Sequence, residues 1–331
     1  MQASGSASAK KKKKDKPLPD FVLRGHAASV VSLGWTSDGR TLASGGLDGS
    51  LMLWSLETRR CALRFAGTHE GQGVNTVSFD KHHANRLWSQ GRDGWIRHWD
   101  AETQQCISAH DVGCHGFVGL AIAYTASSCY GALPDPNDMQ GVLLLRMDTR
   151  EKHVQVAHQF ASEPSHGMCM KLACSVRNDA PQVYCGYEAG HVVTYSEAGG
   201  RHVFPAPVEK KFPLTAIGIH TSSGLGCVGG AEQALFPFNS SDSTRLEYLD
   251  VTLSIPGRGL NDIAFRDDAK VYATAGWDGK VRLFATRKGR ERIVCVCEFH
   301  SESINSVAFQ PDAKLFAAAS KDARISLWNV C

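Results

Sequence analysis

The sequence has no long apolar run, no C-x-x-C pair and no large excess of charge of either sign. No stretch approaches the roughly 18 consecutive apolar residues that cross a bilayer, so we expect no membrane-spanning segment. The first 20 residues contain lysines and small polar residues without an apolar core, which indicates no secretory signal. These absences together predict a protein of the nucleus and cytoplasm.

The 11 cysteines are few for a chain of 331 residues and do not suggest a disulfide framework. We expect reduced thiols, many of them buried as small apolar side chains. Cys114 and His115, beside His110, form the one cluster that hints at a metal, but no second ligand pair stands at zinc spacing. The sequence therefore predicts no metal and no cofactor.

The net charge of +3 hides an uneven distribution. The lysines of segment 10–16, less Asp15, contribute +5, so the remaining chain carries −2 (3 − 5). A body of that charge is not expected to bind nucleic acid directly. We expect residues 1–19 to be disordered, and their lysine run is typical of a nuclear-import signal, a polyanion-binding arm or a merely solubilising tail.

A strand–turn–strand unit that ends in a bulky residue recurs along the chain. Clear copies are TLASGGLDGSLMLW ending at Trp54, RLWSQGRDGWIRHW ending at Trp99, VYATAGWDGKVRLF ending at Phe284 and LFAAASKDARISLW ending at Trp328; weaker copies end at Met147, Tyr195 and Phe238. Successive ends are 45, 48, 48, 43, 46 and 44 residues apart. This spacing predicts an all-β fold, a seven-bladed WD-repeat β-propeller with four antiparallel strands in each blade.

The repeats carry polar residues at matching positions. In such blades a histidine from the loop leading into the blade, a Ser or Thr, the turn Asp and the strand Trp form a buried hydrogen-bonded chain, called the tetrad below. A buried Asp is tolerable only where imidazole and backbone donors satisfy it. The expected tetrad residues are His26, Ser44, Asp48 and Trp54 in blade one, His69, Ser89, Asp93 and Trp99 in blade two, Thr274 and Asp278 in blade six, and His300, Asp322 and Trp328 in blade seven.

Five blades depart from this pattern. Blade six ends in Phe284, which has no indole donor, and blade seven has Ala318 where a hydroxyl is expected. Blades four and five have Ala189 and Glu232 in place of the Asp, and blade three keeps only its strand pattern. We interpret all the tetrad residues as structural and not as catalytic.

The two ends of the chain suggest how the ring closes. The sequence stops at Cys331, directly after the third strand of blade seven, so that blade needs a fourth strand from elsewhere. Segment 20–26, DFVLRGH, precedes blade one and has no other strand to pair with. We predict that it completes blade seven and removes an exposed edge. Residues 1–19 are then a tail and residues 20–331 a single propeller domain.

Motifs for enzymatic chemistry are missing from the sequence. It has no phosphate-binding glycine loop between a strand and a helix, no Gly-x-Ser-x-Gly elbow and no His-Glu-x-x-His pair. Acidic pairs such as Asp267–Asp268 fall in predicted hairpin turns, where solvation explains them. We expect no enzyme, and instead a monomer that presents surfaces to protein partners within a larger complex.

One face of the ring is expected to collect the loops that lead into the blades and the turns that carry the tetrad Asp. The residue before each Asp should point outward there, and Trp277 is the kind of aromatic anchor that carries interface energy, unless it packs over a neighbouring blade. A second candidate is the blade-three turn 133–141, which we expect to protrude. The candidate partner surface comprises Arg92, Glu188, Trp277, Lys321, Pro134, Asp135, Pro136 and Asn137.

Several strings make the sequence similar to one WD-repeat family. They include FVLRG at 21–25, LWSLETRR at 53–60, GYEAGHVV at 186–193, ATAGWDGKVRLF at 273–284 and KDARISLW at 321–328. At these residues the chain resembles the family of G-protein β-subunit-like protein 1 and ASTRA-associated protein 1, over residues 20–331. The resemblance implies an adaptor that works with the Tel–Tti proteins and the heat-shock-90 co-chaperone machinery. Its clients would be phosphatidylinositol-3-kinase-related kinases, with a bearing on DNA-damage signalling and a chromatin-linked complex.

Two other functions of propellers compete with this adaptor role. A heterotrimeric G-protein β subunit would need an N-terminal helix with heptads, which residues 1–20 lack. A reader of histone tails or a substrate receptor of a ubiquitin ligase stays open, although the docking motif of such a receptor needs Arg where Glu102 stands.

Overall fold

The structure is a computed structural model. It describes residues 17–331 apart from 149–151, 206, 208–210, 243, 258, 287–290, 312–314 and 330–331. Of the predicted tail, residues 1–16 lie outside the described part of the chain, so its disorder and its role stay predictions.

Seven antiparallel sheets make up the fold. Blade one contains β2 (Val30–Trp35), β3 (Thr41–Gly46), β4 (Leu51–Ser55) and β5 (Arg60–Phe65), and blade two contains β6 (Val74–Phe79), β7 (Arg86–Gly91), β8 (Gly94–Asp100) and β9 (Cys106–Cys114). Blade three contains β10 (Ala121–Tyr124), β11 (Cys129–Pro134), β12 (Val142–Asp148) and β13 (His153–Phe160), and blade four contains β14 (Cys169–Arg177), β15 (Ala180–Tyr187), β16 (Val192–Ser196) and β17 (Arg201–Phe204).

The remaining blades follow the same order of strands. Blade five contains β18 (Ala216–Ile219), β19 (Leu225–Gly229), β20 (Ala234–Asp242), β21 (Arg245–Tyr248) and the short β22 (Leu253–Ser254), and blade six contains β23 (Leu260–Phe265), β24 (Val271–Gly276), β25 (Lys280–Ala285) and β26 (Arg292–Glu298). Blade seven contains β27 (Ile304–Phe309), β28 (Leu315–Ser320), β29 (Arg324–Asn329) and β1 (Phe21–Arg24). A single 3₁₀ turn, η1 (Pro164–His166), precedes β14.

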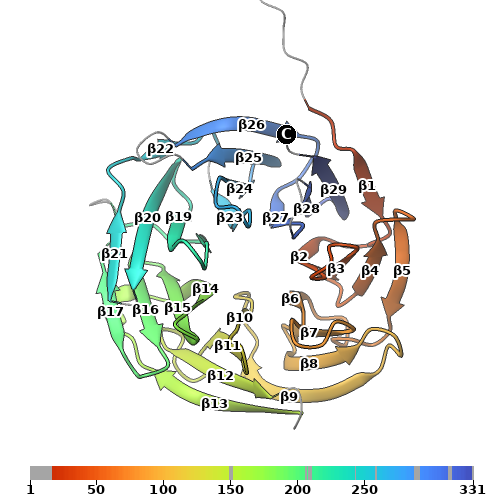
Figure 1. The fold of residues 1–331 in the computed structure, drawn as a ribbon, viewed down its shortest axis with the longest axis horizontal. Coiled ribbons are helices and arrows are strands. Elements are labelled where there is room, and N and C mark those ends of the chain that lie inside the picture. Colours follow the sequence, from red (N-terminus) through yellow and green to blue (C-terminus); the bar gives the residue numbers. More distant parts are fainter. Residues whose placement is uncertain are drawn as a thin grey trace, which may run out of the picture.

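The sheets stand around a central axis, and the red start of the chain meets its blue end (Figure 1). Strand β1 pairs antiparallel with β29, from Phe21 opposite Leu327 to Arg24 opposite Arg324. The prediction of a seven-bladed propeller closed by an N-terminal strand is therefore confirmed. Among the described residues, no helix has both the length and the apolar character needed to cross a membrane.

The core lies between the blades. Each pair of neighbouring sheets encloses its own apolar cluster, so the ring has seven clusters instead of one centre. The second strand of a blade is covered on both faces, as in β3, where Leu42 and Ala43 are fully buried. Burial on both faces explains why these strands read as continuous apolar runs.

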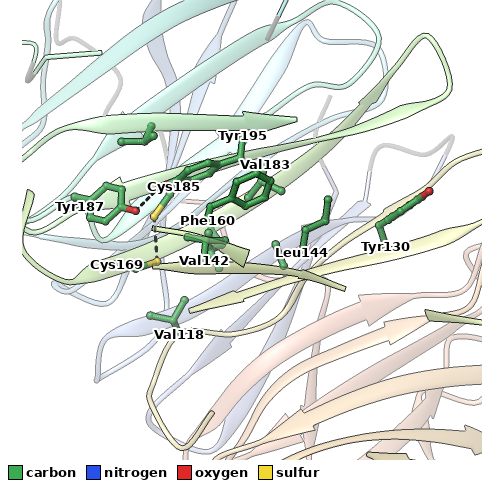
Figure 2. Packing of buried hydrophobic residues seen from close by; sticks show 13 residues of the cluster. Val118, Tyr130, Val142, Leu144, Phe160, Cys169, Val183, Cys185, Tyr187 and Tyr195 are labelled. Carbon is green, nitrogen blue, oxygen red and sulfur yellow. Dashed lines mark hydrogen bonds between the residues drawn. The ribbon is translucent and has the colours of Figure 1, made fainter. Parts of the chain in front are cut away.

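Figure 2 shows the cluster between blades three and four. The thiols of Cys169 and Cys185 lie 3.1 Å apart, and the hydroxyls of Tyr187 and Tyr195 are 2.8 Å apart. Burial raises the pKa of the Cys169 thiol far above its usual range, so this thiol stays protonated. The ten described cysteines are all free, as the sequence predicts for reduced thiols.

Short turns join the second and third strands at one end of the ring, except in blade three, where residues 135–141 form a longer loop. In blades one, two and six the residue after the tetrad Asp is Gly49, Gly94 or Gly279, with φ of 80°, 86° and 74°. Glycine adopts this left-handed conformation without a steric penalty. Blade seven has Ala323 there, at φ 65°, where an L side chain is disfavoured.

Candidate functional site: the channel face

Blade two brings all four of its predicted tetrad residues together. The indole of Trp99 donates to the Ser89 hydroxyl at 2.8 Å, and the two nitrogens of His69 lie 2.8 Å from Ser89 and from Asp93. Because a carboxylate only accepts and an indole only donates, the neutral imidazole donates through Nδ1 and accepts at Nε2. Arg97 adds a second donor to Asp93. Burial lowers the pKa of His69, which keeps the imidazole neutral.

Blade one differs from the expected tetrad at its acidic end. Trp54 donates to Ser44 at 2.7 Å, and Ser44 lies 2.6 Å from Nε2 of His26. Nδ1 of His26, however, bonds Ser50 at 2.9 Å, and it is Ser50 that donates to Asp48 at 2.6 Å. The interposed hydroxyl moves the carboxylate outward, so Asp48 is exposed and not buried as predicted. Burial lowers the pKa of His26 to about 4.

Blade seven completes its tetrad with a residue that the sequence analysis missed. His300 binds Asp322 at 2.9 Å, as predicted, but its Nε2 lies 2.8 Å from Ser326. Ser326 also accepts from the indole of Trp328 at 2.7 Å. Ser326 stands directly opposite Ala318 in the β28–β29 register, so the hydroxyl comes from the neighbouring strand of the sheet.

Blade six replaces the histidine chain with an ion pair. Both terminal nitrogens of Arg282 bind Asp278, at 3.1 and 2.6 Å, and the guanidinium also donates to the Pro256 carbonyl. The Arg282 side chain is only 4% exposed, whereas that of Asp278 is 26% exposed. Thr274 is buried and bonds the backbone oxygen of Arg282 at 3.4 Å, outside any tetrad.

These anchors hold the turns of the channel face, defined here as the end of the ring that carries Leu47, Arg92, Glu188, Trp277 and Lys321. Each of the five residues precedes the tetrad position in its own blade. The backbone N–H of each bonds a carbonyl of the loop leading into the same blade, at Ser29, Gly73, Met168, Gly259 and Ser303, over 2.8 to 3.1 Å. The structure thus places all five equivalently on one face.

Trp277 is 43% exposed on this face. Its indole nitrogen donates to Asn261 at 2.7 Å, and its ring covers Gly259 so closely that a Cβ there would overlap ring atoms. The ring is therefore fixed against its own blade with one side open. Leu47 at 40% and Phe117 at 53% exposure are further apolar side chains near the axis.

A channel of about 570 Å³ runs along the inner strands, with Leu47, Arg92, Phe117 and Lys321 at its wall. The charged residues that line it are Arg92, Lys171, Lys321 and Asp262. Lys171 pairs with Asp262 at 3.1 Å, which leaves a net charge of +2 (3 − 1). Within the described ranges, Arg92 and Lys321 form no ion pair, so the mouth of the channel is basic and partly apolar.

Asparagines near the axis join neighbouring blades and were not singled out from the sequence. The side-chain amides of Asn75, Asn261 and Asn305 donate to carbonyls of the next blade, at Gly116, Ile304 and Val30, over 2.7 to 2.8 Å. Their shared position in VNTVSF, LNDIAF and INSVAF is the signal that could have identified them. Asn75 also accepts from Arg92 at 3.1 Å, which orients that guanidinium.

The blade-three turn is exposed at Pro136, Asn137 and Met139, but Asp135 is not part of its surface. Asp135 is 2% exposed and accepts from the side chain of Gln159 on β13 and from the Asn137 backbone, so it is a buried anchor. Pro134 is the last residue of β11, and only Pro136 and Asn137 of the four predicted residues are exposed. The Asp135 carboxylate points inward because the Gln159 amide donates a hydrogen bond to it there.

The described residues contain no group of three or more His, Cys, Asp or Glu side chains that could hold a metal ion. His115 instead lies 3.2 Å from the backbone oxygen of Arg92. Trp277, Arg92 and Lys321 can offer stacking, charge and hydrogen bonds to a partner, which is the chemistry of recognition.

The seven sheets and their repeats make this chain a WD-repeat β-propeller. A family model described as "WD domain, G-beta repeat" matches residues 18–55, 251–284 and 291–329. The matched segments contain the three inner strands of blades one, six and seven, respectively.

Several proteins are similar to this chain over most of its length. The chain is 29% identical over 295 residues to guanine nucleotide-binding protein subunit beta-like protein 1 of Mus musculus, which covers 87% of this chain and 89% of the mouse protein. It is 26% identical over 346 residues to ASTRA-associated protein 1 of Schizosaccharomyces japonicus, covering 87% and 92% of the two chains. The protein of that name in Verticillium alfalfae is 23% identical over 322 residues, covering 86% and 76%. The resemblance inferred from the sequence is confirmed.

Proposed function

We propose that this protein is a non-enzymatic adaptor that binds protein partners through its channel face. The observation that carries the proposal is the rigidly held Trp277, exposed beside a basic channel mouth with Leu47 and Phe117. Aromatic side chains that are fixed before binding lose little entropy in a complex and form the centres of interfaces. The proposed partner segment carries carboxylates for Arg92 and Lys321 and apolar side chains for the aromatic rings.

The relatives suggest the setting in which this adaptor works. Three similar proteins are named for likeness to a G-protein β subunit or for association with ASTRA. We propose that the chain acts, as the resemblance implies, with the Tel–Tti and heat-shock-90 co-chaperone system in the maturation of phosphatidylinositol-3-kinase-related kinases. The lysine run at 10–16 supports a proposed distribution between nucleus and cytoplasm.

The competing function as a reader of histone tails fits this face less well. A histone tail is rich in lysine and arginine, and it would meet the unpaired cations Arg92 and Lys321 at the channel mouth. Like charges brought together in an interface lower affinity. For a ubiquitin-ligase receptor, the position that needs Arg is Glu102, which instead accepts a hydrogen bond from Asn85.

Binding of purified Tel–Tti complex to the purified protein tests this proposal. Trp277→Ala should weaken binding about tenfold or more, and Arg92→Glu with Lys321→Glu should do the same. The matched control is Arg40→Glu, an exposed reversal before β3, at the opposite end of the strand from Leu47. Equal affinity of folded wild-type and channel-face variants would refute the proposed surface, and no binding by wild type would refute the proposed partner.

A further inference from the structure

The outer strands of the seven blades fall into two groups. Five of them are four to seven residues long and carry arginine, namely β1, β5, β17, β21 and β26. The outer strands of blades two and three are longer, with nine residues in β9 and eight in β13. Strand β9 has one charged residue, Asp111, and β13, with the sequence HVQVAHQF, has none.

An uncharged outer strand is unusual because its far edge offers unpaired backbone groups. Natural sheets protect such edges with charged side chains, and arginine serves that purpose in the other five blades. Strand β13 is the last strand of its sheet and pairs only with β12. Its Val156 is 56% exposed, the highest exposure of any valine among the described residues. The edge of β13 is thus long, neutral and open.

A groove of about 480 Å³ lies beside this edge, between blades two and three. Its apolar walls are Trp95, Ala109 and Val112 from blade two, and Leu143, Leu145, Val154 and Val156 from blade three, while His110, Asp111 and Gln155 make up its polar part. Val156 lies opposite Leu145 in the β12–β13 register, so these side chains share one face of the sheet. Leu143 and Leu145 also belong to the buried cluster between the two blades, and the groove is its open outer end.

We propose that the outer edge of β13 binds an extended, uncharged segment of a partner protein, which adds a fifth strand to blade three and fills this groove with alternate apolar side chains. The main-chain hydrogen bonds would supply affinity, and the groove would select the side chains. Pairing would run along His153–Val156, because the register shifts between Leu144 and Leu145, after Val156. An adaptor of this kind holds two partners at once, one on the channel face and one on the rim.

The observations favour an extended segment over a second copy of this chain. Two round propellers that met rim to rim would touch along one strand each, well short of the roughly 1,200–2,000 Å² that a stable interface buries. A single flexible segment can pair with the edge of β13 and at the same time place its side chains in the groove. The neutrality of HVQVAHQF also matches an uncharged ligand and offers no ion pair to a charged one.

Hydrogen exchange with a defined peptide tests the proposal. The probe is a capped ten-residue peptide of alternating Val and Thr, N-methylated along one edge so that it can pair through its other edge but cannot build sheets of more than two peptides. At saturation it should slow exchange of the β13 amides that β12 leaves unpaired by about fivefold or more. A peptide N-methylated on both edges is the control and should have no effect. Protection that is absent from β13, or equal on all outer strands, would overturn the proposal.

Paired valine substitutions separate the β13 edge from general effects on the rim. Val156→Lys should weaken peptide binding about tenfold, since lysine on an edge opposes strand addition. Val294→Lys, on β26 of blade six, changes a valine of similar exposure, 47% against 56%, and should leave binding unchanged. Thermal unfolding shows whether both variants fold. Equal affinity of the two variants for the peptide would contradict binding at the β13 edge. Dimerisation of the wild-type protein through β13 in the absence of peptide would show that a second copy, and not a partner segment, occupies this edge.

Discussion

Blades two and six hold the same turn with different chemistry. In blade two a chain of uncharged groups runs from Trp99 through Ser89 and His69 to Asp93, and Arg97 is a second donor to that carboxylate. Blade six has no histidine at this place, and the guanidinium of Arg282 reaches its turn carboxylate directly. Both arrangements tie the turn to the sheet, so the fold requires an anchored carboxylate and tolerates either partner. They differ in how each responds to mutation and to pH.

The largest effect is expected for Asp278→Ala in blade six. The Arg282 side chain is a cation and only 4% exposed, so loss of its partner leaves a buried, uncompensated charge. Removing one member of such a pair costs about 3–5 kcal/mol. Urea unfolding measures the loss. Asp250→Ala, at an exposed carboxylate between β21 and β22, is the control and should change stability by less than about 0.5 kcal/mol. Similar losses for the two variants would show that the ion pair does not anchor the turn.

Acid should weaken the blades that are anchored by a buried histidine. Burial lowers the pKa of His26 to about 4. Between pH 6.5 and 4 the imidazole is therefore protonated in the unfolded chain and neutral in the folded chain. Stability is therefore lost as the pH falls from about 6.5 to 4, by about 3 kcal/mol for His26 alone, and this loss stops below the folded pKa. The pKa values of His69 and His300 are also lowered by burial and act in the same direction.

Unfolding free energies measured between pH 7 and 4 test this linkage. His26→Gln should flatten the dependence by about one proton, because Gln does not titrate. An identical slope in wild type and His26→Gln would rule out His26 as the titrating group.

Asp93→Ala in blade two should be milder than Asp278→Ala. It leaves the His69 N–H and one donor of Arg97 unsatisfied, but the imidazole is neutral and the Arg97 side chain, 13% exposed, has some access to water. An orphaned buried donor costs about 1–3 kcal/mol. The same urea titrations measure it. A larger loss than for Asp278→Ala would reverse the ranking of the two blades.

The sequence predicted the ring, its closure and the residue types of the anchors, because period and turn chemistry are local signals. It did not predict partners that depend on register or on side-chain direction. Arg282 lies four residues beyond Asp278, at the spacing that Arg97 and Asp93 share, but the sequence did not show that it would replace the histidine chain. Asp135 turns inward because Gln159, from a strand 24 residues later, supplies an amide. On the candidate surface, the positions of the turn residues followed from the repeat. The packing of Trp277 on Gly259 did not, because it depends on the direction of the side chain.

The smallest and most selective effect concerns the hydroxyl of blade seven. Ser326→Ala removes the acceptor of the Trp328 indole and the partner of His300 Nε2, and should cost about 1–2 kcal/mol. Ala318 stands opposite it, at the position where Ser89 stands in blade two. Adding Ala318→Ser to Ser326→Ala should therefore restore most of the lost stability, while Ala318→Ser alone should not stabilise the wild type. Unfolding of the four variants as a double-mutant cycle measures this coupling. Additive losses would mean that the two sites are not interchangeable, and that blade seven depends on its hydroxyl coming from β29.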